Sequence, residues 1–280
     1  MPLRVFELLC LPILALAMAL TARRVGARRF AIDYVTLAIA GWIGEATSIA
    51  SYRHYEYAPE WDLRVLAVPL LVPLIWPLVI LSAREVRTAL FPHASALVGS
   101  LIVTMLVIAD ASMVEVLAVR AGLWTWAEDG HLGVPVLGIL AWGYFAGAAD
   151  WMLRRFAGRD RWLVVPGALG VAHLVIVLSW WGCFRWVLRG DLGWRGVAVV
   201  VVLGVLASLV ALRLRRRGRV IPLAVAVPRV VAATLFFALL VSIGLDVALW
   251  LHVISVAVPY AIATEIFLPR SKIARTNANR

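Results

Sequence analysis

The feature that most constrains this chain is a series of long apolar runs that follow one another along almost its whole length. They fall at approximately 5–22, 30–50, 64–82, 95–119, 133–153, 162–186, 196–212, 228–245 and 247–268. Most have close to the roughly 20 residues that an α-helix needs to cross a bilayer. The pattern predicts an all-α, polytopic transmembrane helical bundle with a single integral membrane domain over residues 1–280.

The composition also separates this chain from soluble proteins. Hydrophobic residues make up 63% of its 280 residues and charged residues only 15%, whereas a soluble domain is nearer half apolar and a quarter charged. The net charge of +11 comes mainly from arginines between the apolar runs. The clusters are Arg23, Arg24, Arg28 and Arg29; Arg84 and Arg87; Arg154, Arg155, Arg159 and Arg161; and Arg213, Arg215, Arg216, Arg217 and Arg219. Short basic loops of this kind mark the cytoplasmic side of a membrane protein rather than a nucleic-acid interface.

These clusters predict an orientation. With the basic loops inside, the sides alternate through nine helices, with the N-terminus outside and the C-terminus in the cytoplasm of a bacterial inner (plasma) membrane. The basic tail (Arg270, Lys272, Arg275 and Arg280) fits the same side. Eight helices, with one long kinked segment around Gly244 to Asp246, are the alternative. We expect the first run to be a retained helix rather than a signal peptide, because only Arg4 precedes it and four arginines follow it.

Residues 30–82 and 95–153 read as two parallel copies of one helix-hairpin unit. The first copy contains Tyr55-Glu56-Tyr57, Val68-Pro69 and Trp76. The second contains Trp124-Thr125-Trp126, Val134-Pro135 and Trp142. In both copies a tryptophan follows the proline by seven residues, and we expect each proline to start a helix, where its missing N–H costs nothing. Each unit also has an acid in its first helix, Glu45 and Asp110 respectively.

Ionisable residues inside the apolar runs are the candidates for function, because a charged group costs several kcal/mol within a membrane. They are Asp33, Glu45, Asp110, Glu115, Asp150, His173, Arg185, Asp246, His252 and Glu265. The positions of Asp33, Asp150 and Glu265 near cytoplasmic helix ends favour anchoring to interfacial water or basic loops. We expect the two histidines to be hydrogen-bonded inside the bundle, and Arg185 and Asp246, at outer helix ends, are candidates for pairing.

Glu45 and Asp110 lie below outer loops that are rich in aromatic residues. These loops hold Tyr52, His54, Tyr55, Tyr57, Trp61, Trp124, Trp126 and His131. One interpretation is an interfacial aromatic belt above two carboxyls that bond to neighbouring helices. The other is one pocket with two catalytic carboxyls at its floor. Its predicted substrate-binding residues are Tyr55, Tyr57, Trp76, Trp124, Trp126, Trp142 and His54.

Such a pocket suits acid chemistry on an apolar substrate. Apolar surroundings keep a carboxyl protonated at neutral pH, so that it can act as a general acid. Protonation of an alkene gives a tertiary carbocation, which the faces of Trp and Tyr stabilise. Capture by water would make the protein a hydratase, and capture by an internal double bond would make it a cyclase. The substrate would be a lipid-soluble isoprenoid that enters from the bilayer.

Several other classes lack their required residues. An opsin needs a lysine in its last helix, and the only lysine is Lys272 in the tail. Neither the paired Asp-rich motifs of membrane prenyltransferases nor the histidine clusters of membrane iron enzymes are present. Cys10 and Cys183 have no spaced partners for a metal or disulfide. We therefore expect neither a metal nor a cofactor, and we interpret Gly143-x-x-x-Gly147 as a helix-packing motif.

The two units resemble the membrane-integral carotenoid hydratases of the bisanhydrobacterioruberin hydratase or carotenoid 1,2-hydratase type, more broadly called carotenoid biosynthesis proteins. The first motif of that family is matched by Glu45, Tyr55, Tyr57, Val68, Pro69 and Trp76. The second is matched by Asp110, Gly122, Trp124, Trp126, Gly133, Val134, Pro135 and Trp142. The resemblance covers residues 40–145 and implies hydration of a terminal double bond without a cofactor.

The chain departs from the hydratase pattern at several positions. Gly138 stands where the family has Asn, Ile139 replaces Phe, Ala141 replaces Gly, and Ser51 and Arg53 stand near the missing glycines of the first turn. Membrane lycopene cyclases are more distantly similar, through Gly122-Leu123-Trp124. Their acidic motif is absent, since Val136, Leu137 and Gly138 occupy that stretch. A cyclase that uses Glu45 or Asp110 would instead resemble the fungal membrane terpene cyclases.

Three functions are therefore compatible with the sequence. The first is a carotenoid hydratase in which Glu45 or Asp110 donates the proton and the other positions water or stabilises charge. The second is a membrane terpene or lycopene-type cyclase that uses the same protonation. The third is a non-enzymatic transporter or pathway scaffold. A parallel repeat with polar groups toward one face favours an enzyme over the inverted repeats of many transporters.

Overall fold

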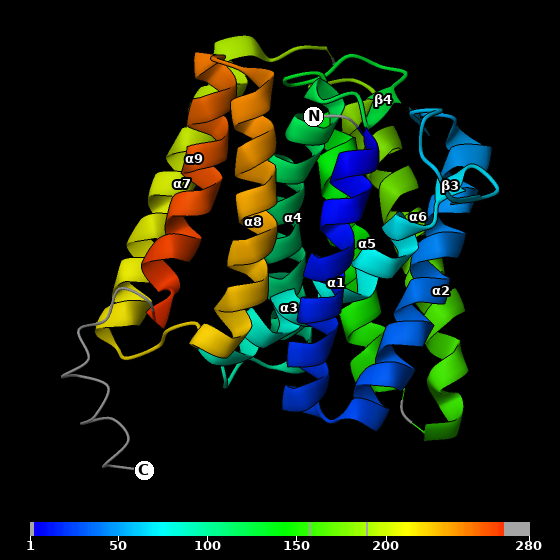
Figure 1. The fold of residues 1–280 in the computed structure, drawn as a ribbon, viewed down its shortest axis with the longest axis vertical. Coiled ribbons are helices and arrows are strands. Elements are labelled where there is room, and N and C mark those ends of the chain that lie inside the picture. The colour runs from blue at the N-terminus through cyan, green and yellow to red at the C-terminus, as the bar shows by residue number, and fades with distance from the viewer. Residues whose placement is uncertain (1–2, 157, 189, 266–280) are drawn as a thin grey trace.

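The apolar runs form helices that stand side by side, and their connections gather at the two ends of the bundle (Figure 1). The computed structural model describes residues 3–156, 158–188 and 190–265. Within these residues there are nine α-helices: α1 (Leu3–Val25), α2 (Ala27–Tyr52), α3 (Leu71–Leu90), α4 (Ala96–Arg120), α5 (Val136–Arg155), α6 (Val164–Ser179), α7 (Gly193–Arg216), α8 (Leu223–Ile243) and α9 (Val247–Ala263). A 3-10 turn, η1 (Gly158–Leu163), precedes α6, and a π-helical turn, η2 (Trp180–Phe184), follows it. The predicted all-α bundle is confirmed. The chain breaks between α8 and α9 at Gly244, whose φ of 104° ends the helix.

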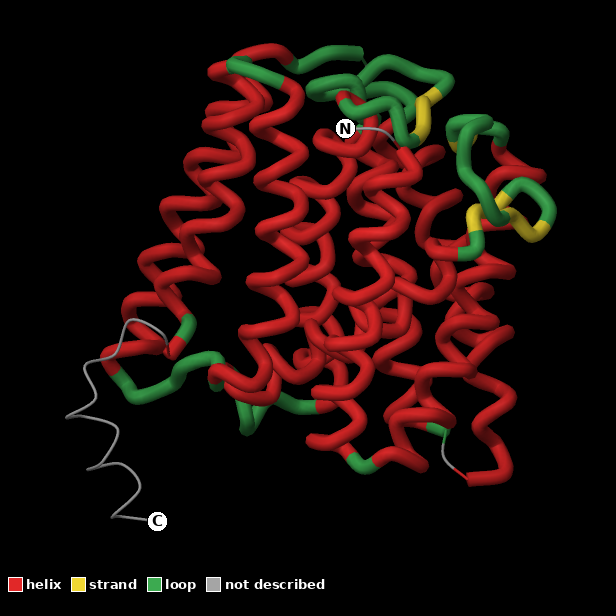
Figure 2. The backbone as a smooth tube through the Cα atoms, in the orientation of Figure 1, coloured by secondary structure: helices red, strands yellow, loops and turns green. Residues whose placement is uncertain are grey.

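One end of the bundle carries the aromatic loops and four short strands, and we call it the aromatic end (Figure 2). The strands are β1 (Tyr55–Tyr57), β2 (Arg64–Val65), β3 (Val68–Pro69) and β4 (Trp124–Trp126). Strand β1 follows α2, and β4 follows α4. The two pair antiparallel in the register Tyr55↔Trp126, Glu56↔Thr125 and Tyr57↔Trp124. This ladder joins the two proposed repeat units directly.

The predicted helix over 64–82 is wrong in its bounds. Residues 64–69 form the β2–β3 hairpin, which turns at Leu66 with a positive φ of 58°. Helix α3 begins only at Leu71 and continues to Leu90. Leu63 and Leu66 are exposed in this hairpin, so hydropathy alone does not distinguish it from a buried helix. Pro135 does cap its helix, α5, as expected, whereas Pro69 ends β3 instead.

The described part of the chain contains six helical segments that are long and apolar enough to cross a membrane. They are Leu3–Val25, Ala96–Arg120, Val136–Arg155, Asp160–Phe184, Gly193–Arg216 and Leu223–Ile243, and α9 is a shorter apolar helix. Many large apolar side chains of α1, α6 and α7 are exposed on the outside of the bundle. Apolar surface of this extent needs a lipid environment. The chain is an integral membrane protein.

Helices α4 and α5 approach each other closely because glycines lie at their contact. A Cβ at Gly143 would come within 2.4 Å of Ile108 Cγ1, and one at Gly147 within 1.9 Å of Thr104 Oγ1. The Gly143-x-x-x-Gly147 spacing is therefore a packing motif, as predicted. This contact holds the middle of α4 against the middle of α5.

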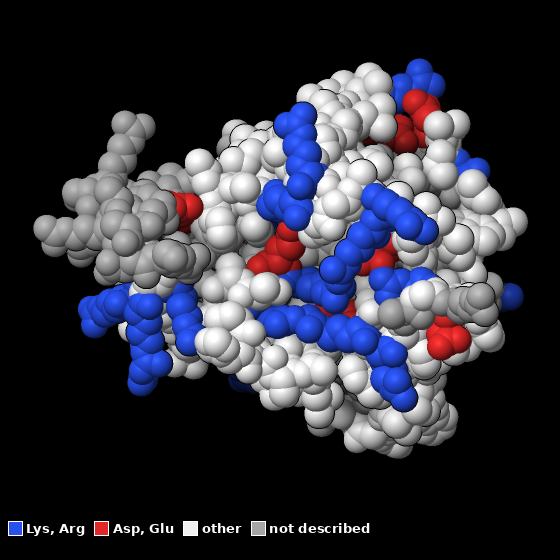
Figure 3. Space-filling model, turned by 90° about the horizontal axis from the view of Figure 1, so that it is seen from below, with Lys and Arg blue, Asp and Glu red and all other residues white. Residues whose placement is uncertain are grey.

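The opposite end of the bundle carries the arginine clusters, and we call it the arginine end (Figure 3). Asp33 pairs with Arg161, and Arg24 Nη2 lies 2.6 Å from Glu85 Oε2. The buried Asp150 accepts from Arg154 Nε at 2.7 Å and from Ser100 at 2.7 Å, with Arg84 at 3.4 Å. The expected anchoring of Asp33 and Asp150 to basic segments is confirmed.

Glu265 also lies at the arginine end. Its carboxylate accepts from the backbone N–H of Leu223 at 3.2 Å. The four basic tail residues, Arg270, Lys272, Arg275 and Arg280, lie outside the described residues.

Candidate functional site

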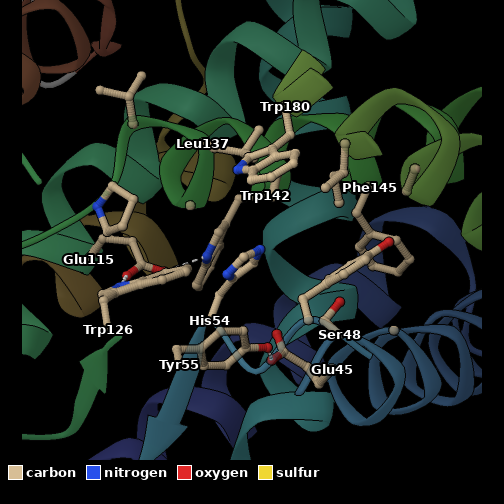
Figure 4. A pocket seen from close by; sticks show the side chains of 18 of the residues that line it. Glu45, Ser48, His54, Tyr55, Glu115, Trp126, Leu137, Trp142, Phe145 and Trp180 are labelled. Carbon is tan, nitrogen blue, oxygen red and sulfur yellow. Dashed lines mark hydrogen bonds between the residues drawn. The ribbon is translucent and has the colours of Figure 1, made fainter. Parts of the chain in front are cut away.

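A pocket with a volume of about 140 Å³ lies at the aromatic end, between the two repeat units and α6. Glu45 and all seven predicted substrate-binding residues line it: His54, Tyr55, Tyr57, Trp76, Trp124, Trp126 and Trp142. A second carboxyl, that of Glu115, lines it as well. Figure 4 shows Glu45 with Tyr55 on one side of the pocket, and Glu115 with Trp126 on the other.

Glu45 comes from α2, and its carboxylate accepts three hydrogen bonds. The hydroxyls of Tyr55 and Tyr57 both donate to Oε2, the latter at 2.9 Å. Trp76 Nε1 donates to Oε1 at 2.9 Å. The side chain is buried, so these bonds replace the water that a carboxylate would otherwise bind.

Glu115 comes from the last turns of α4 and is only 2% exposed. Its three donors are all indoles. Trp124 and Trp126 donate to Oε2 at 2.9 and 3.1 Å, and Trp142 donates to Oε1 at 2.6 Å. An indole N–H can only donate, so every protein group that bonds to this carboxyl in the structure is a fixed donor.

The two carboxyls are related by the internal repeat. Tyr55 and Tyr57 bond to Glu45 as Trp124 and Trp126 bond to Glu115, and the strands that carry them pair antiparallel. Trp76 and Trp142, which complete the two sets, contact each other with ring centroids 4.6 Å apart. Contacts of this kind are expected of two parallel units related by an approximate two-fold axis along the helices.

Asp110 does not line this pocket, and the prediction that it shares one with Glu45 is wrong. Its carboxylate accepts from Arg229 Nη2 of α8 at 2.5 Å. Arg229 also donates to Ser82 and lies 4.6 Å from the ring centroid of Tyr260. Five helical positions rotate a side chain by about 500°, or about 140° net, so Asp110 and Glu115 point to different sides of α4.

A signal for Glu115 is present in the sequence spacing. Glu45 precedes Tyr55 by 10 residues, and Glu115 precedes Trp124 by 9, whereas Asp110 precedes it by 14. One glutamate therefore occupies the equivalent place in each repeat.

The wall toward α6 contains further polar groups. His173 contacts the hydroxyl of Tyr52 through Nδ1 at 2.8 Å and that of Thr47 through Nε2 at 3.1 Å. His54 stacks on Tyr52, and Ser48 lines the same wall. His173 thus has hydrogen-bond partners, as expected, but they lie at the pocket rather than in an apolar core.

Gly138, the main departure from the hydratase pattern, lies directly against Trp126. A Cβ on Gly138 would come within 2.6 Å of the indole ring. The space that an asparagine side chain would need is therefore occupied by Trp126, which bonds to Glu115.

The two tyrosines in β1 remain neutral donors over a wide pH range. Burial raises the pKa of Tyr55 and the pKa of Tyr57 well above the ordinary value, and the charge of Glu45 raises both further. Their hydroxyls can therefore donate to Glu45 at any physiological pH. Among the described residues, no group of three or more His, Cys, Asp or Glu side chains could hold a metal ion.

The remaining ionisable residues of the apolar runs have structural partners. His131 and His252 are buried and contact each other at 3.2 Å, away from the pocket lining, and His252 Nε2 lies 2.9 Å from the carbonyl of Ser112. Asp246 caps α9 and lies 3.3 Å from Arg120. Arg185 lies over three indole rings, those of Trp180, Trp181 and Trp186.

Comparison with known families places these motifs in a wider context. Comparison with curated proteins and with solved structures finds no match for the chain. The family model described as "Carotenoid biosynthesis protein" matches residues 5–205. This range includes every residue that lines the pocket, and it ends before Arg229 and the rest of α8 and α9. Because the match covers well over half of the chain, this integral membrane protein belongs to the carotenoid biosynthesis protein family.

Proposed function

We propose that this protein is a carotenoid hydratase that protonates a terminal C=C bond and adds water to the resulting cation. The observation that carries the proposal is the pair of buried carboxyls, Glu45 and Glu115, in one pocket with aromatic walls. Membership of the carotenoid biosynthesis family supports the substrate class. Glu115 takes the place that the sequence alone gave to Asp110.

The different donors around the two carboxyls support different roles. The indoles around Glu115 stabilise its anion, but they cannot accept a hydrogen bond from its protonated form. A proton on Glu115 is therefore free to be directed toward a substrate in the pocket. We assign Glu115 as the general acid.

Glu45 is better suited to receive a proton from water. Two of its partners are hydroxyls, which can either donate or accept, so both of its protonation states can be hydrogen-bonded. In the proposed step, the alkene takes a proton from Glu115. Water then bonds to the tertiary cation and loses a proton to Glu45. Transfer of that proton back to Glu115 restores the starting state.

The remaining pocket residues support the cation and the water. Trp76 contacts both Trp142 and Phe145, and the three rings present π-faces that stabilise a carbocation. Ser48 and His54 line the pocket and are able to hold a water molecule. In this role they replace the asparagine that the hydratases have at the position of Gly138.

Expression in a bacterial host that accumulates lycopene tests the proposal. We expect a more polar pigment, heavier by one water, by chromatography and mass spectrometry. Glu115→Gln and Glu45→Gln should each lower its formation by about 100-fold or more. Glu56→Gln is the matched control, because Glu56 is exposed on the same strand between the two tyrosines and does not line the pocket.

Two results would reject hydration. An isobaric pigment with a shorter chromophore would identify a cyclase, and unchanged lycopene with the protein present in the membrane would exclude both reactions on this substrate. Full activity in both glutamine variants would show that the acid mechanism is wrong.

Deuterated water separates the roles of the two carboxyls. Without Glu45, no carboxylate accepts the proton that the attacking water must lose, so hydration stops. The cation can still lose a proton to Glu115 and become an alkene again. The Glu45→Gln variant should therefore incorporate deuterium at the substrate terminus without hydration, and Glu115→Gln should incorporate none. The reverse pattern would exchange the two assignments.

A further inference from the structure

The pocket around the two carboxyls is small for a long isoprenoid. Its volume of about 140 Å³ is close to the roughly 150 Å³ of an engineered cavity that holds one benzene molecule. One terminal group of an isoprenoid fits beside Glu45 and Glu115, but the rest of a long chain must lie elsewhere. The strand ladder lies over the pocket at the aromatic end, and the contact of Trp76 with Trp142 lies between the two units.

A second cavity continues from the pocket toward the side of the bundle. Its volume is about 240 Å³. It shares five lining residues with the first: Tyr52, His54, Leu137, Ile176 and Trp180. The residues that line it alone are Ser51 at the end of α2, Val177 near the end of α6, and Trp181 in η2. These three are exposed on the outside of the bundle, with 39% of Val177 and 56% of Trp181 accessible.

The local structure of α6 leaves this side open. The helix changes to the π-helical turn η2 at Trp180, beside the second cavity. Such turns are rare and often occur at functional sites. His173 bonds to Thr47 and Tyr52 and ties α6 to α2. The two helices are thus joined at His173, one turn before Val177.

We propose that the slot between the end of α2 and η2 is a lateral portal that holds the isoprenoid chain of the substrate and leads it into the bilayer. The inference rests on the proposed function for the nature of the occupant. The terminal group lies at the two carboxyls, the first chain units pass Leu137 and Ile176, and the remainder lies along Val177 and Trp181 in lipid. Leu137, Ile176 and Val177 give this path an apolar lining, so an apolar chain can pass from lipid to the pocket without entering water.

Tryptophans placed in the slot test the portal. Val177→Trp and Ser51→Trp fill it from its two sides. Leu174→Trp is the matched control, because Leu174 is 58% exposed on α6 and lines neither cavity. Each variant is checked for a thermal unfolding midpoint like that of the wild type. The substrates are a full-length linear polyene and a short monoterpene with the same terminal double bond.

We expect both slot variants to lower conversion of the polyene by about tenfold or more, because the added ring competes for the space of the chain. Conversion of the monoterpene should stay within about twofold, and Leu174→Trp should change neither rate. Equal losses for both substrates, or no loss for the polyene, would show that the slot is not a portal.

A binding measurement tests the portal independently of whether the protein carries out the proposed reaction. Polyene that co-purifies with the Glu115→Gln variant is quantified by its visible absorbance, with and without Val177→Trp. Pigment that depends on an open slot supports the portal even if the wild type converts nothing. If the wild type and both slot variants convert the polyene equally well, the proposed reaction stands and the portal is wrong.

Discussion

At the scale of single residues, the indole of Trp126 is held by two neighbours. Its Nε1 donates to Glu115 at 3.1 Å, and its ring lies against Gly138. The ring also contacts Tyr55, with centroids 4.9 Å apart, so it links both carboxyl environments. A Cβ added at Gly138 would therefore displace the ring that bonds to Glu115.

We therefore predict that Gly138→Ala lowers both stability and activity. Overpacking of a buried contact typically costs about 1–3 kcal/mol, and the displaced ring would weaken one of the three bonds to Glu115. Thermal unfolding and product formation measure the two effects.

Gly170→Ala in α6 provides the control, because an added Cβ there meets nothing within 4 Å. It should be neutral or slightly stabilising, since alanine favours helix by up to about 1 kcal/mol over glycine. If Gly138→Ala and Gly170→Ala have the same unfolding temperature and the same activity, the proposed role of the Gly138–Trp126 contact is wrong.

The sequence predicted the pocket's aromatic residues better than its acids. The aromatic-x-aromatic pairs stand at fixed offsets from Pro and Trp, so the repeat identified them directly. The choice of Asp110 over Glu115 rested on the second repeat unit and on the resemblance to the hydratase motif, and not on the side of α4 to which each acid points. A helix periodicity of 3.6 residues separates the two, but sequence alone does not show which side of α4 faces the pocket, because both sides are packed against other helices.

At the scale of elements, α4 carries two acids with different partners. Glu115 belongs to the pocket, whereas Asp110 joins α4 to α8 through Arg229. Arg229 lies beyond the part of the chain that the family model matches. The Asp110–Arg229 pair therefore attaches α8 to the part of the chain that the family model matches, and its position indicates a structural role.

We predict that Asp110→Asn destabilises the protein without removing its chemistry. Removing one partner of a fully buried ion pair costs about 3–5 kcal/mol, because the other charge is left uncompensated. The side chains of Arg229 and Asp110 are 18% and 20% exposed, so we expect a loss at or below the lower end of this range. Unfolding in mixed micelles would measure this loss, and deuterium incorporation should persist in the folded fraction.

The double variant Asp110→Asn with Arg229→Gln should recover part of the lost stability, because no buried charge remains unpaired. If the folded Asp110→Asn variant incorporates no deuterium, Asp110 takes part in proton transfer to the substrate and its role is not only structural.

Element boundaries were predicted well where an apolar run coincides with one helix. The break at Gly244 and the start of α5 after Pro135 are examples. The β2–β3 hairpin was missed because Leu63, Val65 and Leu66 are apolar yet exposed. Hydropathy records the preference of a side chain for an apolar environment, and it does not record whether the backbone that carries the side chain is helical.

At the scale of the whole molecule, the arginine clusters and the aromatic loops lie at opposite ends. The strands of the aromatic end lie at one end of the helices, and the arginine clusters lie at the other (Figures 1 and 3). Because short basic loops stay in the cytoplasm, the aromatic end is expected at the outer face.

Cysteine labelling tests this orientation. Single cysteines are introduced at Glu60, which is exposed at the aromatic end, or at Arg217, which is exposed at the arginine end, in a background without Cys10 and Cys183. In intact cells a membrane-impermeant maleimide should label the first and spare the second. The opposite labelling would place the pocket on the cytoplasmic side.

The antiparallel ladder between β1 and β4 means that the site forms only where the two repeat units meet. The units on either side of the short loop at 91–95 each bring one glutamate and its three donors, and neither encloses a pocket alone. A gene cut within that loop would encode two fragments that regain the site only by meeting in the same membrane. The carboxyl-lined cavity is in this sense an interface within one polypeptide.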